Sequence, residues 1–213
     1  MKINILCDNE NSWFWKTSKE FIHELEQLGN QVNVCKQESE LIKADISAFI
    51  SCNKIVSASG LNKSLSNIVC HPSDLPKGKG FSPIAWEILN GANFLTFTLF
   101  EADEKVDNGN IYKKVKIELK GTELSKEIKA LQAKTTYSMI LEYIKNYPVV
   151  DSYQQVGEST YYKRRYSSNS EIDLNKTIHE QFNLFRIVDN ELYPAFFLHQ
   201  GKKYILKIFE EEN

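Results

Sequence analysis

Short apolar runs that alternate with helical patterns open this chain, and this alternation constrains its fold most strongly. Residues 2–7 (KINILC) predict a buried strand, and residues 13–28 predict a helix whose apolar side chains recur on one face. Further strands are expected at 31–35 and 45–51, separated by a short helical turn. Strands and helices in this rhythm predict an α/β fold, a Rossmann-like and mostly parallel sheet with helices on both faces.

The turn after the first strand carries no GxGxxG pattern. Glycines at that spacing let the backbone approach a dinucleotide pyrophosphate at the start of a helix. We therefore predict a Rossmann-like layout that does not bind a dinucleotide in the usual way.

Charge and hydropathy exclude several classes of protein. A net charge of −2 over 213 residues supplies no basic face for nucleic acid. No apolar run approaches the ~20 residues that a membrane span requires, and the first residues do not resemble a signal peptide. We expect a cytoplasmic protein without membrane or nucleic-acid partners.

Cysteines and histidines give no sign of a metal site. The four cysteines are dispersed without a CxxC pair, which indicates small hydrophobic residues in a reducing compartment. His23, His179 and His199 have no ligand-like spacing, so we predict no metal.

The stretch from residue 67 to 111 concentrates the residues that can do chemistry. His71 follows an apolar run that predicts a strand, and a loop rich in proline and glycine leads to a helix and a second strand at 94–100. Asp107 lies in the acidic loop that follows. We expect both side chains at the carboxyl ends of parallel strands that one strand–helix–strand crossover joins. A carboxylate beside an imidazole can move a proton and stabilise an oxyanion, although a single histidine after a strand is more often structural.

The second half of the chain completes this domain and adds a smaller part. A strand at 111–119 and a long helix ending near 146 predict a first domain over 1–148. Residues 149–173 are polar and rich in tyrosine, which predicts an extended connector. A helix at 175–188 and a β-hairpin over 193–209 then form a small C-terminal subdomain within 149–213, packed on the core.

These motifs together resemble a known family. The run HPSDLP from His71, then Gly80, Pro83 and Trp86, and later VDNGNI around Asp107, is similar to formyltransferases that use 10-formyltetrahydrofolate. That family includes glycinamide ribonucleotide, methionyl-tRNA and sugar N-formyltransferases. The resemblance implies a Rossmann-like domain and 10-formyltetrahydrofolate as the formyl donor.

The sequences of several further segments narrow the resemblance to one group within this family. HPSDLPKGKGFSP, TLFEADEKVDNGNIY, QVGESTYYKRR and FNLFRIVDNELYPAFF resemble formyltransferases of pseudaminic-acid and related sugar pathways. The implied acceptor is the 4-amine of a nucleotide-linked 4-amino-4,6-dideoxy sugar, in particular a UDP-linked N-acetyl-altrosamine type. By analogy with the family, a homodimer through the C-terminal segment is also expected.

The resemblance assigns the catalytic pair to His71 and Asp107, with one departure from the family pattern. The family's asparagine two residues before the histidine is Val69 here, so a hydrogen-bond donor to the formyl oxygen is missing. Asn53, after the strand at 45–51, is the substitute that we favour over Asn67. A turn residue that satisfies local backbone is an equally good interpretation of Asn53.

Folate-binding residues follow from the same alignment. Lys54, Ile55 and Val56 match the wall that holds the pterin, although Ile55 and Val56 also suit an ordinary core. Asp103 and Val106 belong to the loop that encloses the other side of the ring.

Four further residues are expected to bind the sugar nucleotide. Lys77 and Lys79 lie in the glycine-rich loop and can meet a diphosphate, or can simply be solvated. Trp13 suits a base or sugar pocket, or aromatic packing. Arg186 suits a phosphate contact or, slightly better, a structural ion pair.

Three hypotheses about function therefore stand. The first is a sugar-nucleotide N-formyltransferase. The second is a formyltransferase acting on another amine, such as dTDP-4-amino-4,6-dideoxyglucose, glycinamide ribonucleotide or an aminoacyl carrier. The third, motivated by Val69, is a folate- or nucleotide-binding relative that has lost catalysis.

Overall fold

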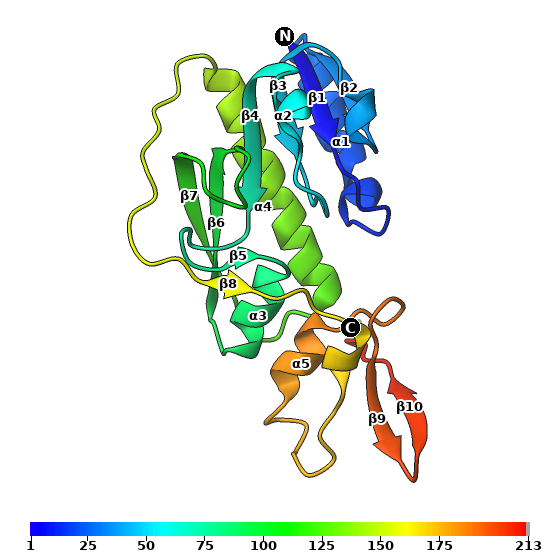
Figure 1. The fold of residues 1–213 in the computed structure, drawn as a ribbon. Helices are drawn as coiled ribbons and strands as arrows, with labels where there is room; N and C mark the ends of the chain where they lie inside the picture. Colours follow the sequence, from blue (N-terminus) through cyan, green and yellow to red (C-terminus); the bar gives the residue numbers. More distant parts are fainter. Residues whose placement is uncertain (212–213) are drawn as a thin grey trace.

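A six-stranded mixed sheet forms the centre of the computed structural model, which describes residues 1–211 (Figure 1). Its order is β2-β1-β3-β4-β6-β7; β2, β1, β3 and β4 are parallel, and β6 is antiparallel to both β4 and β7. The strands are β1 (Lys2–Leu6), β2 (Gln31–Cys35), β3 (Ala44–Phe49), β4 (Ser64–His71), β6 (Phe94–Glu101) and β7 (Ile111–Glu118). The predicted Rossmann-like, mostly parallel layout is confirmed.

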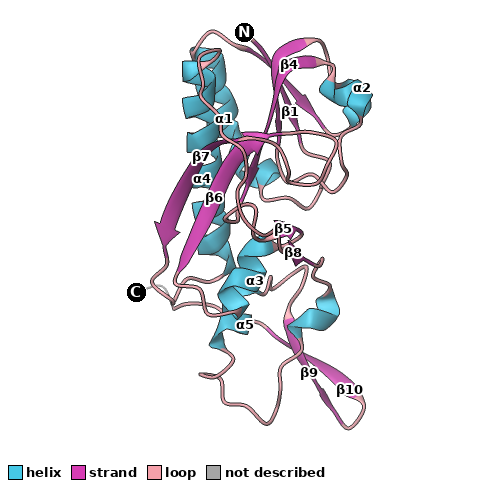
Figure 2. Ribbon diagram, turned by 60° about the vertical axis from the view of Figure 1, so that its left-hand side comes forward, coloured by secondary structure: helices cyan, strands magenta, loops and turns pink. Residues whose placement is uncertain are grey.

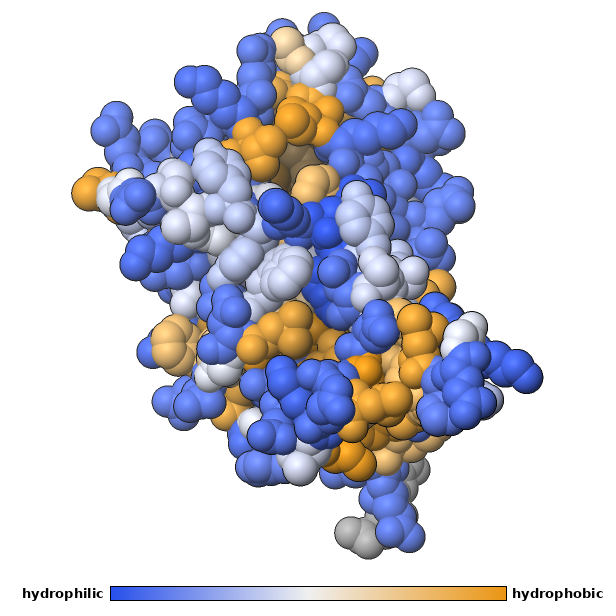
Figure 3. Space-filling view, turned by 60° about the horizontal axis from the view of Figure 1, so that its bottom comes forward, coloured by the Kyte–Doolittle hydropathy of each residue, from blue (hydrophilic) through white to orange (hydrophobic). Residues whose placement is uncertain are grey.

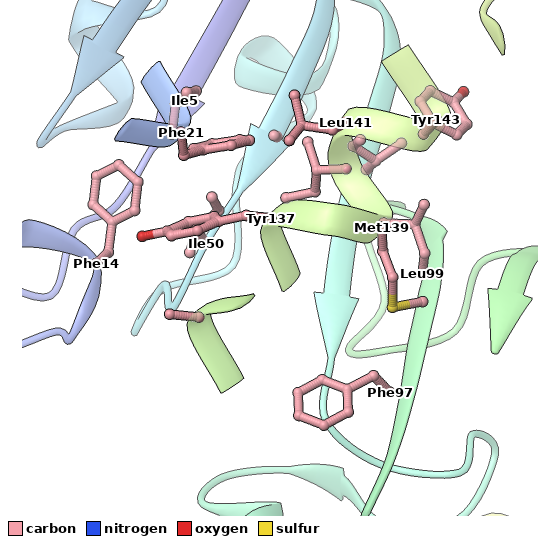
Figure 4. Close-up of a cluster of buried hydrophobic side chains, with 14 of the residues drawn as sticks. Ile5, Phe14, Phe21, Ile50, Phe97, Leu99, Tyr137, Met139, Leu141 and Tyr143 are labelled. Atoms are coloured by element: carbon pink, nitrogen blue, oxygen red, sulfur yellow. The ribbon is translucent and has the colours of Figure 1, made fainter. Parts of the chain in front are cut away.

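The long helices α1 (Phe14–Gln27) and α4 (Ser125–Asn146) pack on one face of this sheet (Figure 1). Helix α1 buries Phe14, Phe21 and Leu25, whose spacing of seven and four residues keeps them on one side of the helix. Figure 4 shows Phe14 and Phe21 beside Tyr137 of α4, whose ring stacks on Phe21 with centroids 4.3 Å apart. This face holds the main hydrophobic core.

Shorter elements cover the opposite face. The 3-10 helix η1 (Glu38–Glu40) and helix α2 (Ala58–Leu61) flank a smaller apolar cluster built on Leu6, Phe49 and Val56. Strand β4 alternates between the two faces, so Ile68 enters the main core while Val69 packs in the smaller clusters. By the same alternation His71 lies on the face of Val69, away from α1 and α4.

The expectation that His71 and Asp107 follow parallel strands joined by one crossover is wrong, because β6 runs antiparallel to β4. Thr98 of β6 pairs with His71, and Glu101, the last residue of β6, pairs with Ile68. Helix α3 (Pro83–Leu89) has 7 residues and therefore extends only about 10 Å, whereas a parallel return along β4 needs about 25 Å. The chain therefore re-enters the sheet from the same end, and the loop after β6 must turn back to bring Asp107 to His71.

The C-terminal part is built around a separate apolar cluster. It contains the 3-10 helix η2 (Ser167–Ser170), helix α5 (Phe182–Ile187) and the hairpin β9 (Ala195–His199) and β10 (Lys202–Leu206) (Figure 2). Leu184, Phe185 and Val188 form the centre of the cluster, and Leu89 of α3 packs against it. A C-terminal helix and a hairpin are thus both present, while the domain boundary at 148/149 stays a prediction.

The helix predicted over 175–188 is wrong in its first half. Only residues 182–187 are helical, because the preceding polar side chains bond to the local backbone instead. Asp173 accepts from the N–H of Asn175 at 2.9 Å, and Glu180 accepts from the N–H of Thr177 at 2.8 Å.

Among the described residues, no helix has the length and apolar composition needed to cross a bilayer. All four cysteines are free thiols. Cys7 and Cys35 are buried, and Cys52 and Cys70 are half-buried.

Candidate active site

His71 and Asp107 come together beneath the proline- and glycine-rich loop. His71 ends β4 and is 8% exposed, and its Nε2 lies 3.7 Å from Oδ2 of Asp107. The same Nε2 is 2.9 Å from the carbonyl oxygen of Gly78. Because a carbonyl oxygen only accepts, Nε2 carries the proton and donates it to Gly78. The imidazole therefore presents an N–H donor within ion-pair distance of a carboxylate.

Glycines of the loop allow this close approach. Gly80 has a φ of +92°, and a Cβ there would lie 2.7 Å from the backbone oxygen of Tyr162. Its N–H donates to Oδ2 of Asp107 at 2.8 Å. The loop thus supplies a backbone donor that fixes the carboxylate beside the imidazole.

The loop between β6 and β7 is equally tight. Asp107 has a φ of +49°, a left-handed conformation in which aspartate is one of the few tolerated side chains. Two residues later, a Cβ on Gly109 would lie 1.8 Å from the backbone oxygen of Glu101. The Asp-Asn-Gly sequence therefore matches the backbone that turns Asp107 back toward His71.

Lys79 places a buried positive charge beside this pair. It is 3% exposed, and its Nζ donates to Oδ1 of Asn108 at 3.3 Å. Within residues 1–211, no carboxylate lies within ion-pair distance of Nζ. Lys77, by contrast, is exposed. A lysine buried without a carboxylate raises the positive potential around its neighbours.

Cys70, next to His71, does not form a nucleophilic pair with it. Its side chain points to Met139 on the other face of the sheet, with the two sulfur atoms 3.8 Å apart. Burial raises the pKa of the Cys70 thiol to about 12. The thiol is therefore protonated at neutral pH.

Asn53, the residue that we expect to replace the family asparagine, is exposed. The backbone N–H of Asn53 donates to Asp8, and its Oδ1 accepts from Nη2 of Arg164 at 2.9 Å. Asn67 instead donates from Nδ2 to the carbonyl oxygen of Leu61 at 3.0 Å. Val69 packs among apolar side chains.

Some of the residues expected to hold the folate are exposed, and one is buried in the core. Ile55 is 59% exposed and Val106 is 41% exposed, whereas Val56 is buried among the apolar side chains of the smaller cluster. Lys54 is exposed, and its N–H donates to Asp8 at 3.1 Å. Asp103 accepts from the N–H of Lys105 at 2.8 Å within its own loop.

Two residues expected to bind the sugar nucleotide make internal contacts instead. Arg186 is buried and donates from Nη2 to Glu123 at 2.9 Å, the structural ion pair that was the slightly favoured interpretation. Trp13 is half-buried and packs on Tyr137 with ring centroids 5.6 Å apart.

A polar cavity of about 440 Å³ lies between the Asp107 loop and the connector. Carboxylates and amides line it, including Glu101, Asp103, Asn108 and Gln155. Sequence reasoning missed Gln155, Thr160 and Arg164, because all three lie in the connector and bond to residues far away in the chain. Asn108 could have been found, since it directly follows Asp107.

A family model described as "Formyl transferase" matches residues 16–144, which include both strands and loops of this site. The chain belongs to the formyl transferase family. Members of this family transfer a formyl group from 10-formyltetrahydrofolate.

A curated relative supports this membership. Methionyl-tRNA formyltransferase from Lachnospira eligens is 30% identical over 185 residues, which are 83% of this chain and 56% of that protein. The curated relatives are longer, since the chain spans between 26% and 56% of the first three.

Solved structures share the whole fold of the chain. Methionyl-tRNA formyltransferase from Clostridium thermocellum is similar at a TM-score of 0.82 and 23% identity, covering 100% of this chain and 94% of that one. A 4-N formyltransferase from Francisella tularensis gives a TM-score of 0.72 at 21% identity, over 100% of this chain and 98% of that one.

Proposed function

We propose that the chain is an N-formyltransferase that moves the formyl group of 10-formyltetrahydrofolate to the 4-amine of a nucleotide-linked 4-amino-4,6-dideoxy sugar. The observation that carries the proposal is the buried His71 whose Nε2 lies 3.7 Å from Asp107, at a rim with exposed apolar side chains. More narrowly, we propose a UDP-linked N-acetyl-altrosamine type of acceptor, from the resemblance to enzymes of pseudaminic-acid pathways. We place the reaction in the cytoplasm.

The chemistry uses the two groups in different roles. The neutral amine attacks the formyl carbon, and negative charge develops on the formyl oxygen. When the formyl group is bound, His71 turns its Nε2–H from the carbonyl oxygen of Gly78 to that oxygen, while Asp107 accepts a proton from the amine, directly or through water. The bond from the formyl carbon to the folate nitrogen then breaks, and that nitrogen takes a proton.

Asn53 is the amide that we propose as the second donor to the formyl oxygen. Arg164 holds its Oδ1 at 2.9 Å, which leaves the Nδ2–H₂ group to donate toward a ligand. Arg164 also stacks over Phe81, at 4.3 Å from the ring centroid. The Phe81 ring therefore helps to hold the guanidinium in the position from which it orients the Asn53 amide.

The exposed apolar side chains suit the folate ring. Ile55 and Val106 give an aromatic ring system two apolar surfaces that would otherwise face water. We propose that Lys54 and Asp103 border this site. Lys77 is available to the diphosphate of the sugar nucleotide, and the buried charge of Lys79 adds to the potential there.

The acceptor class is tested by an assay with purified protein. It is incubated with 10-formyltetrahydrofolate and a panel that contains UDP- and dTDP-linked 4-amino sugars, glycinamide ribonucleotide and methionyl-tRNA. Tetrahydrofolate release is followed by absorbance, and the formylated product by mass spectrometry. We expect release only with a 4-amino sugar nucleotide. Release with another amine alone, or folate binding without turnover, would reject the proposal.

We also propose that two copies associate through the C-terminal hairpin. Leu198, Tyr204 and Ile205 are 50%, 45% and 58% exposed on this hairpin. Figure 3 shows apolar side chains gathered on this end of the molecule. Light scattering during size-exclusion chromatography should give the mass of two chains for the wild type and of one chain for Ile205→Lys. The mass of one chain for the wild type would reject this association.

A further inference from the structure

The first part of the predicted connector, residues 149–166, touches both loops of the His71–Asp107 pair, and the name connector is kept below for this part. It leaves the end of α4, passes outside β7 and crosses toward α3 (Figure 1). Tyr153 forms an antiparallel bridge with Ile111, and β8 (Tyr161–Tyr162) pairs with β5 (Lys79–Gly80). One continuous segment therefore reaches the loop that holds His71 and the loop that carries Asp107.

Gln155 is the contact to the Asp107 loop. Its Nε2 donates to the carbonyl oxygen of Asp107 at 3.0 Å and to that of Gly109 at 2.9 Å. These carbonyl groups flank Asn108, at the point where Asp107 has its left-handed φ of +49°. A sparsely populated backbone conformation persists only where its surroundings hold it, and a single amide group holds this one from two sides.

Thr160 is the contact to the His71 loop. Its Oγ1 accepts from the N–H of Gly78 at 2.8 Å, and its carbonyl oxygen accepts from the N–H of Lys79 at 2.9 Å. Gly78 is the residue whose carbonyl oxygen accepts from Nε2 of His71. Thr160 thus fixes the peptide group that orients the imidazole.

Other bonds anchor the connector beside these two contacts. Trp86 donates from Nε1 to the carbonyl oxygen of Lys163 at 2.8 Å, and the hydroxyl of Tyr162 donates to Glu87 at 2.9 Å. Burial and the neighbouring Glu87 carboxylate raise the pKa of Tyr162 to about 12, so this hydroxyl keeps its proton at neutral pH. The segment is therefore tied to α3 as well as to both loops.

We propose that Gln155 and Thr160 are positioning residues, through which the connector sets the separation of His71 and Asp107. This inference rests on the proposed function, because it gives the two contacts a role in that reaction. Geometry of this kind matters, since misplacing a reacting group by about 1 Å costs on the order of 100-fold in rate.

The decisive variant is Gln155→Glu. Glutamate has nearly the same shape but no N–H group, so both donated bonds to Asp107 and Gly109 are lost and a carboxylate meets two carbonyl oxygens. We expect kcat to fall by about 10- to 100-fold while KM for folate and acceptor changes less than about twofold. Val156→Glu is the matched control, because it adds the same charge at a neighbouring side chain that is 86% exposed.

A second variant tests the other loop, and an NMR measurement tests both without turnover. Thr160→Val removes the hydroxyl that accepts from Gly78 and should lower kcat about tenfold. The imidazole carbon–proton signals of His71, assigned by their loss in His71→Ala, should move in Gln155→Glu and in Thr160→Val and stay in place in Val156→Glu.

The outcomes separate this inference from the proposed function. Should Gln155→Glu lose its fold by thermal melting, Gln155→Met removes the donor without adding charge and replaces it in both measurements. Full kcat in a folded Gln155 variant, with His71 signals unmoved, overturns the inference while the enzyme assignment stands. A wild type without activity on any amine overturns the proposed function, and the NMR comparison still decides whether the connector positions His71.

Discussion

Two ionisable pairs in this molecule, one buried and one half-buried, differ in how fully the chain satisfies their hydrogen bonds. Arg186 of α5 donates to the Glu123 carboxylate at 2.9 Å and from Nε to the Glu123 carbonyl oxygen at 3.3 Å. That carboxylate also accepts from the N–H groups of Lys120 and Gly121. His71 and Asp107 are 3.7 Å apart, and the Asp107 carboxylate accepts one backbone N–H, from Gly80.

This difference distinguishes a pair that holds the fold from a pair suited to chemistry. The Arg186–Glu123 pair has most of its donors and acceptors satisfied within the chain, so it has little capacity left for a ligand. The His71–Asp107 pair is incompletely satisfied and is held in place by strained and glycine-dependent loops. Under-satisfied polar groups of this kind are expected where a substrate completes the bonding.

The largest effect on activity should come from removing either side chain of the His71–Asp107 pair. His71→Ala and Asp107→Ala should each lower kcat by about 10²–10⁴-fold, because the first removes the donor to the formyl oxygen and the second removes the group that accepts the amine's proton. Circular dichroism should show an intact fold in both. If either variant keeps near-wild-type kcat in the formyl-transfer assay, the roles given to the pair are wrong.

Breaking the structural pair should instead cost stability. Arg186→Met leaves the buried Glu123 carboxylate without its guanidinium and should lower the free energy of unfolding by about 3–5 kcal/mol. The exposed Lys113–Glu142 pair is the control, since Glu142→Gln should cost less than about 1 kcal/mol. Urea denaturation measures both. Equal losses for the two substitutions would contradict the comparison.

Asn53→Ala tests whether His71 is assisted by a second donor to the formyl oxygen. Loss of one donor to the formyl oxygen should reduce kcat by about 10²–10³-fold while folate still binds. Single-turnover rates and folate titration separate the two quantities. An unchanged kcat would assign Asn53 to the turn that it also forms.

Substitution of Lys79 should lower kcat/KM more than substitution of Lys77, although the two lysines are only two residues apart in the loop. Lys79→Met removes the buried charge beside Asn108 and should lower kcat/KM about tenfold. Its melting temperature should stay the same or rise, because burying that charge costs free energy. Lys77→Met, at an exposed position, is the control and should lower kcat/KM less than about threefold, with a higher KM for the sugar nucleotide.

The pH dependence of stability gives the smallest effect. Burial alone would raise the pKa of Glu123, but the N–H groups of Lys120 and Gly121 and the Arg186 guanidinium together lower it. A depressed pKa stabilises the fold above the unfolded value near 4.5, and this contribution is lost as the pH falls through the folded pKa. The stability difference between wild type and Glu123→Gln should therefore shrink below pH 4.5. A constant difference from pH 7 to pH 3 would contradict it.

Local pattern was enough to predict most elements of the fold. Apolar spacing gave α1 within one residue at each end and gave β2 with its observed bounds, because burial on one face decides both. The direction of β6 could not be read from its sequence, since an apolar strand looks the same in either direction. Only the shortness of α3 carried that information.

The site was predicted in part for similar reasons. The positions of His71 and Asp107 after predicted strands singled them out, and a resemblance in motifs then gave them roles; the loop glycines that join them lie in those motifs. Gln155 and Thr160 act through bonds to residues 46 and 82 positions away in the chain. No local spacing encodes such contacts, and a glutamine in a polar segment is ordinarily expected to be solvated.

Strand β7 forms one border of the sheet and carries Lys113, Lys114 and Lys116. Glu142 and Asp74 of the same chain hold the first two by ion pairs, and the third lies over the ring of Phe94. A strand from another molecule would have to disrupt these contacts and accept a row of like charges. The β7 edge of the sheet is thereby protected from pairing with a strand of another molecule, and a second copy has to bind elsewhere on the surface.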